Sequence, residues 1–330
     1  MTERFRAYRV HEEGKFGLGR FDTMALEDLD PGEVVVKVAY ASVNYKDALT
    51  ARGRARIAMK FPVVAGNDFS GIVESSADPR FRKGDAVTVQ SHGLGGRHDG
   101  GYAEYARVPA DWLVQLPQGL SLFEASALGV AGNTAAWAIE LMELNGLTPE
   151  KGKVLVNGAT GGVATIAIDI LAQRGYHVVA MTGKTDQVEF LRSLGAAEVI
   201  GRAAIPEKER ALETPLYAGA LDSVGGPLLA WMIRRMDRDG VVAAFGNASG
   251  TAFPGDVIPF ILRGVRLLGV NVNNPQPVME RVWHRLATDY RPRHLERIAH
   301  RIRFDELERA FDELLDAKMT GRYVVDFSLG

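Results

Sequence analysis

A buried strand, a glycine-rich turn and the start of a helix follow one another in the middle of this 330-residue chain, between Val154 and Ala164. The residues read VLVNGATGGVA. Glycines let the backbone turn sharply and approach a pyrophosphate, and the N-terminus of the following helix offers free N–H groups and the positive end of its dipole. The segment therefore predicts a βαβ unit that binds a dinucleotide. The alternative is a loop in an unrelated α/β domain.

The surroundings of this turn favour the dinucleotide interpretation. Apolar runs alternate with helical patterns from about residue 121 onward, which is typical of βαβ crossovers and a parallel sheet covered on both faces. Ala164 takes the place of the third small residue of the glycine fingerprint, and that position tolerates alanine. We expect strands at 153–156, 177–181, 198–200, 218–221, 241–245 and 265–272, with helices near 163–174 and 186–194.

The first 120 residues have a different pattern. Short β-type runs at 34–40, 71–74 and 85–89 are separated by turn signals, which indicates a small β-barrel or strongly coiled sheet. After a linker at 273–277, two helical segments (278–290 and 305–319) precede a last strand at 322–327. The sequence thus predicts a discontinuous barrel domain, residues 1–125 and 275–330, with a doubly wound α/β nucleotide-binding domain inserted at 126–274.

Composition excludes several classes of function. The net charge of -2 gives no global attraction to nucleic acid or to an anionic membrane. No stretch approaches the roughly 18 apolar residues that a membrane span needs, and the start of the chain lacks an apolar signal-peptide core, so we expect a cytoplasmic protein. The absence of cysteine excludes disulfides, thiolate nucleophiles and every zinc site built on sulfur.

The end of the second expected strand selects between the two nicotinamide dinucleotides. NAD-specific sites place a carboxylate there for the ribose 2′-hydroxyl, whereas this chain has Thr182, Gly183 and Lys184. A hydroxyl, a glycine and a cation suit the 2′-phosphate of NADPH, and Arg202 after the third strand is a second candidate cation. The alternative is that Lys184 is a solvated turn residue and that Asp186 only caps the next helix.

Several further segments extend the argument to the whole chain, and they read SVNYKD (42–47), GNDFSG (66–71), KGD (83–85), GYAEY (101–105) and PFILR (259–263). Together with the glycine turn they resemble the medium-chain dehydrogenase/reductase superfamily, and more narrowly its zinc-free quinone oxidoreductase branch, which contains the acrylyl-CoA reductases. The resemblance implies a GroES-like β-barrel catalytic domain, an inserted Rossmann domain and a cleft between them.

The same resemblance explains the missing metal ligands. Asn44 and Asn67 stand where zinc-dependent relatives carry a cysteine and a histidine. His92 and the neighbouring pair His98 and Asp99 have no evident third ligand, so we interpret them as a polar loop and predict no metal.

The resemblance also implies roles for individual residues. Tyr45 is the candidate proton donor or oxyanion donor, Asn44 a candidate donor to a substrate carbonyl, and Asp47 an orienting residue. Tyr45 could instead only position the nicotinamide, and Asp47 and Asp68 could be helix caps or structural hydrogen-bonding groups. The residues expected around the cofactor are Tyr45, Thr134, Thr160, Gly161, Gly162, Val163, Thr182, Gly183, Lys184, Arg202, Asn247, Ile261, Asn271 and Arg322.

Reduction of an activated double bond is the chemistry that needs no Lewis acid. Hydride from NADPH adds to the β-carbon of an enone or an enoyl thioester, the carbonyl takes the charge as an enolate, and the α-carbon receives a proton. The alternatives are an NADPH:quinone oxidoreductase and an NADPH sensor without turnover. A basic run (Arg52, Arg54, Arg56 and Lys60) could meet coenzyme A phosphates or be a solvated loop, and the edge strand 265–272 predicts a homodimer.

Overall fold

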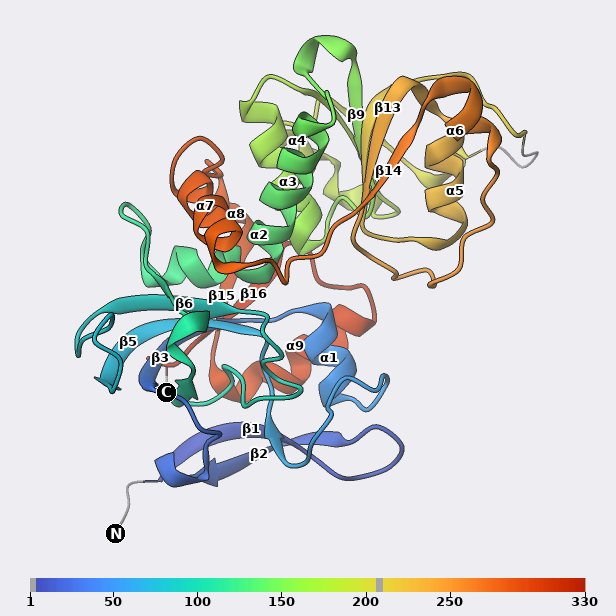
Figure 1. The fold of residues 1–330 in the computed structure, drawn as a ribbon. Helices are drawn as coiled ribbons and strands as arrows, with labels where there is room; N and C mark the ends of the chain where they lie inside the picture. Colours follow the sequence, from blue (N-terminus) through green and yellow to red (C-terminus); the bar gives the residue numbers. More distant parts are fainter. Residues whose placement is uncertain (1–3, 206–209, 330) are drawn as a thin grey trace. The chain divides into compact units, whose positions relative to one another are not determined.

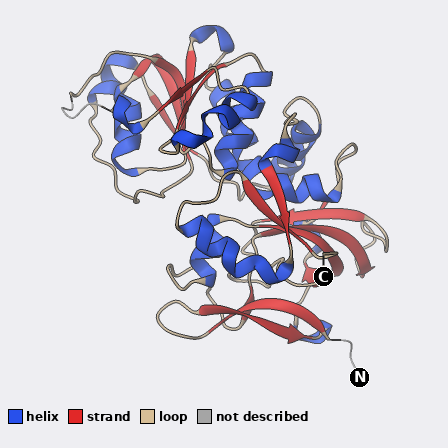
Figure 2. Ribbon diagram, turned by 180° about the vertical axis from the view of Figure 1, so that it is seen from behind, coloured by secondary structure: helices blue, strands red, loops and turns tan. Residues whose placement is uncertain are grey.

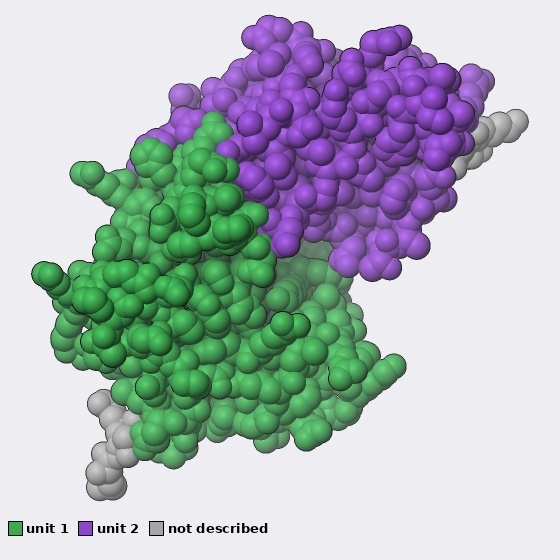
Figure 3. Space-filling model, in the orientation of Figure 1, with its two compact units in different colours: residues 1–130, 273–287, 295–330 green, residues 131–272, 288–294 purple. Residues whose placement is uncertain are grey.

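The computed structural model describes residues 4–205 and 210–329. The chain divides into two compact units, which Figure 3 shows in different colours. Unit 1 consists of residues 1–130, 273–287 and 295–330, and unit 2 of residues 131–272 and 288–294.

Unit 2 contains a sheet of six parallel strands in the order β11-β10-β9-β12-β13-β14. Successive crossovers run outward in both directions from the centre, so α3 and α4 cover one face of the sheet and α5 and α6 the other (Figures 1 and 2). This is the expected doubly wound Rossmann architecture. The strands are β9 (Lys153–Val156), β10 (His177–Met181), β11 (Glu198–Ile200), β12 (Tyr217–Asp222), β13 (Met236–Ala244) and β14 (Arg266–Gly269); the helices are α3 (Gly162–Gln173), α4 (Val188–Ser193), α5 (Gly226–Arg234) and α6 (Ile258–Arg263).

Unit 1 is built on two mostly antiparallel sheets. Its larger sheet has the order β15-β16-β3-β5-β6-β8, with β7 paired to β3, and its smaller sheet has the order β2-β1-β4. The strands are β1 (Phe5–His11), β2 (Leu18–Met24), β3 (Val34–Ser42), β4 (Val63–Val64), β5 (Asp68–Ser76), β6 (Ala86–Gln90), β7 (Tyr105–Val108), β8 (Val114–Gln115), β15 (Ala299–Ile302) and β16 (Arg322–Asp326).

Helices complete unit 1 and connect it to unit 2. Helix α1 (Tyr45–Ala51) contacts α9 (Leu307–Leu315). Helix α7 (Gln276–Ala287) begins soon after the chain re-enters unit 1 at residue 273, and α8 (Leu295–Ile298) begins where it re-enters at residue 295. Helix α2 (Leu122–Leu144) runs from one unit into the other and changes direction at Gly129, whose φ of 42° and ψ of -143° are not helical.

The segment 288–294 lies with unit 2, although the sequence placed the whole C-terminal part of the chain in the barrel domain. The segment forms hydrogen bonds with unit 2: the Tyr290 hydroxyl donates to Glu143 Oε2 at 2.7 Å, and the His294 main-chain N–H donates to Asp169 Oδ2 at 2.8 Å. Helical periodicity around residues 278–290 could not reveal these long-range partners.

Candidate active site

The glycine turn after β9 has the geometry of a phosphate cradle. Gly158 has a φ of +55°, and a Cβ placed on it would lie 2.3 Å from Ser223 Oγ, so this position accepts only glycine. Gly161 is the N-cap of α3 and has no side chain to cap the helix. The first N–H groups of α3, which have no partners within the helix, are therefore available to an anion such as a pyrophosphate.

Hydrogen bonds join the residues that directly follow β9 and β12, next to this turn. The Ser223 N–H donates to Asn157 Oδ1 at 2.7 Å, and the Ser223 hydroxyl donates to the Asn157 carbonyl at 3.0 Å. The sheet order reverses between these two strands, and α/β sheets bind ligands at such switch points, outside the carboxyl ends of the strands. The described part of unit 2 thus fits a dinucleotide at this edge.

Two cations lie at the end of the neighbouring strands β10 and β11. A Cβ on Gly183 would lie 3.8 Å from Arg202 Nε, so the guanidinium of Arg202 lies beside this glycine. The Lys184 N–H donates to Thr182 Oγ1 at 3.0 Å, which orders the turn. Burial lowers the pKa of Lys184, and the nearby Asp186 carboxylate opposes that shift. A phosphate placed among Thr182, Lys184 and Arg202 would offset this desolvation cost.

The remaining predicted cofactor residues of unit 2 lie in different parts of the unit. Asn247 and Asn271 follow β13 and β14 and therefore lie on the same carboxyl edge as the glycine turn. Ile261 lies apart, on α6, with 70% of its side chain exposed, and α6 ends where Arg263 donates to the main chain at the start of β13. Thr134 lies in α2 and is 6% exposed.

The predicted catalytic segment begins α1 in unit 1. Asn44 is the N-cap, and its main-chain N–H donates to Asp47 Oδ2 at 3.0 Å, so Asp47 closes a capping box. Asn44 Nδ2 lies 3.1 Å from Ser42 Oγ, Asp47 Oδ2 and Asp68 Oδ2, and Arg322 Nη2 donates to Asn44 Oδ1 at 3.2 Å. The Asn44 amide is engaged within unit 1 on both its nitrogen and its oxygen.

Asp68 lies at the centre of this buried network. It is 1% exposed and accepts hydrogen bonds from Ser42 Oγ at 2.6 Å and from the Val130 N–H at 2.9 Å. The second bond depends on the break in α2, because a Cβ on Gly129 would lie only 2.6 Å from Asp68 Oδ2. The roles of Ser42 and Gly129 were missed from the sequence, because neither residue type is distinctive without its partners.

Buried charge in this network shifts the pKa of Asp47. Burial and, secondarily, the Asp68 carboxylate raise the pKa of Asp47 to about 7, while hydrogen bonds from Asn44 and Tyr102 act in the opposite direction. Arg322 is 2% exposed, and burial lowers its pKa. One buried guanidinium thus faces two carboxyl groups, and a proton on Asp47 leaves a single negative charge opposite it.

The raised pKa of Asp47 predicts that its contribution to stability depends on pH. Because its folded-state pKa lies above the ordinary value of 3.8, stability is retained in acid and lost as the pH rises through about 7. In Asp47→Asn the side-chain oxygen still accepts hydrogen bonds without titrating. The quantity to compare is the unfolding free energy of the variant minus that of the native protein. We expect this difference to be a few kcal/mol larger at pH 8 than at pH 4, because one pKa unit corresponds to about 1.4 kcal/mol.

Denaturant unfolding at several pH values checks this expectation. Asp78→Asn is a matched control, because the pKa of Asp78 is lowered to about 2 by the bonded Arg80, so its effect on stability has the opposite pH dependence. If the unfolding free energies of the native protein and of Asp47→Asn changed with pH in the same way, ionised Asp47 would not destabilise the folded state.

Tyr45 has a different environment from its neighbours. It is the first residue of α1, 40% of the residue is exposed, and its hydroxyl forms no hydrogen bond with any residue that the structure describes. Arg322, also expected near the cofactor, donates through Nη2 to Ser42 Oγ at 2.6 Å. Arg322 is 2% exposed, whereas Tyr45 is 40% exposed, so Tyr45 is the more accessible of the two residues.

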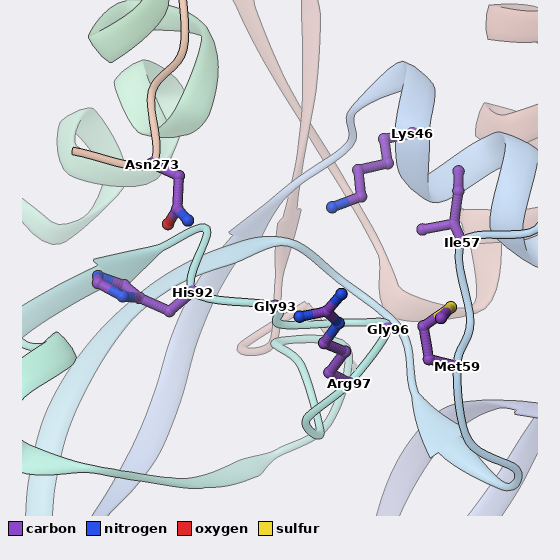
Figure 4. Close-up of a pocket in the computed structure, with 8 residues that line it drawn as sticks. All are labelled: Lys46, Ile57, Met59, His92, Gly93, Gly96, Arg97 and Asn273. Carbon is purple, nitrogen blue, oxygen red and sulfur yellow. The ribbon is translucent and has the colours of Figure 1, made fainter.

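Two of the four residues in the basic run Arg52, Arg54, Arg56 and Lys60 form ion pairs. Arg52 forms an ion pair with Asp312 at 2.8 Å and Lys60 pairs with Asp30, so these two residues do not present free charge to coenzyme A phosphates. A pocket of about 550 Å³ opens nearby in unit 1, and Figure 4 shows its lining residues: Lys46, Ile57, Met59, His92, Gly93, Gly96, Arg97 and Asn273.

The two candidate metal-binding histidines pack on one indole ring. His92 stacks on Trp112 with an interplanar angle of 8°, and His98 meets the same ring edge-on at a centroid distance of 4.9 Å. Within residues 4–205 and 210–329, no group of three or more His, Asp or Glu side chains is placed to hold a metal ion. No helix in the same ranges has the length and apolar character of a membrane span.

Comparisons with known proteins agree with this architecture. Residues 30–118 match the alcohol dehydrogenase GroES-like domain family, and residues 162–288 match the family described as zinc-binding dehydrogenase. The chain is 43% identical to acrylyl-CoA reductase AcuI of Ruegeria pomeroyi over 305 residues, 92% of each chain. It is also 43% identical over 328 residues, 98% of this chain and 99% of the relative, to YhfP of Bacillus subtilis, whose name calls it a quinone oxidoreductase.

Solved structures give the same result. The structure of B. subtilis yhfP with NAD bound has a TM-score of 0.95 and 42% identity and covers 99% of this chain and 100% of its own. The structure of Escherichia coli K-12 YhdH with bound NADPH has a TM-score of 0.94 and 39% identity, with 97% and 99% covered. The chain therefore belongs to the medium-chain dehydrogenase/reductase superfamily, in the branch that contains the quinone oxidoreductases and acrylyl-CoA reductases.

Proposed function

We propose that this protein is an NADPH-dependent reductase of carbon–carbon double bonds conjugated to a carbonyl, with small enoyl thioesters such as acrylyl-CoA as the preferred class. The observation that most supports this proposal is the position of two cations, Lys184 and Arg202, around Gly183 at the carboxyl edge of the Rossmann sheet. It occurs in a chain 43% identical to an acrylyl-CoA reductase over 92% of both lengths.

The residues of unit 2 hold the cofactor in this proposal. The uncapped start of α3 binds the pyrophosphate, Thr182, Lys184 and Arg202 bind the 2′-phosphate, and Asn247 and Asn271 lie along the same edge. Bound NADPH supplies a hydride to the β-carbon of the acceptor. Binding and orientation, rather than bond making, are the task of this unit.

In this proposal the residues of unit 1 stabilise the negative charge of the enolate and provide the proton for the α-carbon. Hydride addition turns the conjugated carbonyl into an enolate, which needs a hydrogen-bond donor, and the α-carbon then takes a proton. The hydroxyl of Tyr45 is the proposed donor because it is exposed and not engaged in the described residues. Asn44, Asp47 and Arg322 act as positioning residues, since their hydrogen bonds hold the start of α1.

Replacing Tyr45 with phenylalanine is expected to lower the rate of the chemical step about 10- to 100-fold while leaving NADPH affinity nearly unchanged. The reason is that a positioned donor contributes of the order of 10²-fold to a proton transfer, and the ring is retained. Single-turnover kinetics and NADPH fluorescence titration separate the two effects. Tyr105→Phe is the control, because it removes another unit 1 phenol. A loss of NADPH affinity alone would make Tyr45 a positioning residue for the nicotinamide.

Two other functions compete with this one. An NADPH:quinone oxidoreductase would use the same cofactor site with a quinone acceptor, as the name of the relative YhfP suggests. A sensor would bind NADPH without turnover, since a fold does not establish catalysis. NADPH absorbance followed with acrylyl-CoA, a simple enone and a quinone distinguishes the three. Acrylyl-CoA should give the highest kcat/KM, and tight NADPH binding with no oxidation by any acceptor would refute both enzyme functions.

We also propose a homodimer formed through β14. This strand is the last in the order of the described sheet, so one row of its main-chain groups lies at a sheet edge. Three apolar residues in and just before α6, the helix that precedes β14 in the chain, are exposed: Val257 (64%), Ile261 (70%) and Leu262 (57%). Light scattering at micromolar concentration should give twice the 35.9 kDa mass of one chain. The mass of a single chain would contradict the proposal.

A further inference from the structure

The pocket in unit 1 is formed by three short segments and by Asn273. Lys46 comes from the first turn of α1, Ile57 and Met59 from the segment that follows this helix, and Arg97 from a glycine-rich loop. Figure 4 shows Lys46, Ile57 and Arg97 extending into the same space. Lys46 directly follows Tyr45, the proposed proton donor, so this pocket adjoins the catalytic segment.

The two cations of the pocket have no anionic partner. Within the described parts of the chain, neither Lys46 nor Arg97 has a carboxylate within ion-pair distance. Arg52, which also follows Tyr45 in the sequence, is by contrast paired with Asp312 at 2.8 Å. The carboxyl group of Asp47, next to Lys46 in the sequence, is instead turned into the buried network with Asn44. The pocket thus holds two positive charges without compensation.

The other walls of the pocket suit an extended, partly apolar ligand. Met59 is 56% exposed, and together with Ile57 it provides apolar surface beside the cations. Gly93, with a φ of +86°, and Gly96 contribute main chain rather than side chains to the lining. A polarizable methionine and an aliphatic side chain can pack against a base or a pantetheine arm.

The three classes of acceptor differ in what they could offer to these charges. Enones and quinones are neutral, whereas a coenzyme A thioester carries a pyrophosphate and a 3′-phosphate. Lysine and arginine are the usual ligands of phosphate, arginine as a fork and lysine as a point charge. We infer that Lys46 and Arg97 bind the phosphate-bearing part of a coenzyme A thioester and thereby select this acceptor over neutral ones. The inference rests on the proposed function.

The test uses Lys46→Met and Arg97→Met, which retain much of the apolar stem and remove the charge. Calorimetric titration with free coenzyme A should show affinity about tenfold lower in each variant, because each substitution removes a charge-assisted hydrogen bond to phosphate. The ratio of kcat/KM for acrylyl-CoA to that for acrylyl-pantetheine, which lacks the nucleotide, should fall by a similar factor. Lys37→Met removes an exposed charge of unit 1 outside the pocket and should leave both quantities unchanged.

Three results would overturn the inference. The first is that the native protein and the two variants bind coenzyme A with equal affinity. The second is that the ratio of kcat/KM for acrylyl-CoA to that for acrylyl-pantetheine does not change. The third is that the variants also lose NADPH affinity to the same extent, which would assign the cations to the cofactor. Failure of the proposed function is a separate outcome. If no acceptor oxidises NADPH, that function is wrong, and the coenzyme A titration still decides whether Lys46 and Arg97 bind phosphate.

Discussion

Replacing Lys184 with glutamate is expected to weaken NADPH binding about 100-fold and NADH binding only a few-fold. Lys184 lies at the turn after β10, and Arg202, which follows β11, lies beside Gly183 of that turn; this is where the proposed function places the 2′-phosphate. The substitution removes one charge-assisted contact and adds a repulsive one, a change of a few kcal/mol for NADPH alone. Fluorescence titration of both cofactors measures the difference directly.

Two controls sharpen this result. Lys151→Glu makes the same charge change at an exposed residue of unit 2, so it reports the general electrostatic effect of added negative charge. Arg202→Gln should reproduce the preferential loss of NADPH to a smaller extent, because it removes charge without reversing it. Equal loss of NADPH and NADH affinity in Lys184→Glu would refute the assignment of the 2′-phosphate site.

Replacing Gly129 with alanine is expected to destabilise unit 1 by at least about 3 kcal/mol. An alanine at a φ of 42° and a ψ of -143° would adopt a backbone conformation close to the region restricted to glycine, which costs of the order of 1–3 kcal/mol, and its Cβ would lie 2.6 Å from Asp68 Oδ2. The side chain of Asp68 is buried and holds Ser42 and the Val130 N–H, so it cannot move without breaking hydrogen bonds. Calorimetric unfolding should show the change as a lower midpoint.

Gly14→Ala is the matched control for this substitution. Gly14 also has a positive φ, +61°, but nothing lies within 4 Å of a Cβ placed there, so only the backbone strain is tested. If both variants lose the same stability, the contact between Gly129 and Asp68 does not constrain the break in α2.

Local patterns predicted the elements of unit 2 well. The run 177–181 and the run 153–156 are strands with those bounds, because a parallel strand buried on both faces is a continuous apolar run. The expected strand 265–272 is shorter, Arg266–Gly269, although the Val270 N–H still donates to the Ala244 carbonyl. The glycine turn follows β9, at the switch point of the sheet, which the strand order of the structure shows and the sequence pattern did not predict.

The buried network of unit 1 could not be predicted in the same way. Arg322 donates to Ser42 across 280 residues of sequence, and no local periodicity reports such a pair. The same limit applies to the basic residues: Arg52 and Lys60 looked available but are paired with carboxylates distant in sequence. The predicted roles of the site residues, Tyr45 among them, stay predictions until the variants are measured.

Deuterium transfer tests the central claim most directly. The protein is supplied with acrylyl-CoA and with NADPH that carries two deuterium atoms at C4 of the nicotinamide, and the product is analysed by mass spectrometry and NMR. A reductase that delivers hydride to the β-carbon gives propionyl-CoA with one deuterium at that carbon and a solvent proton at the α-carbon. Propionyl-CoA without deuterium at the β-carbon, or no propionyl-CoA while a quinone oxidises NADPH, would contradict the account.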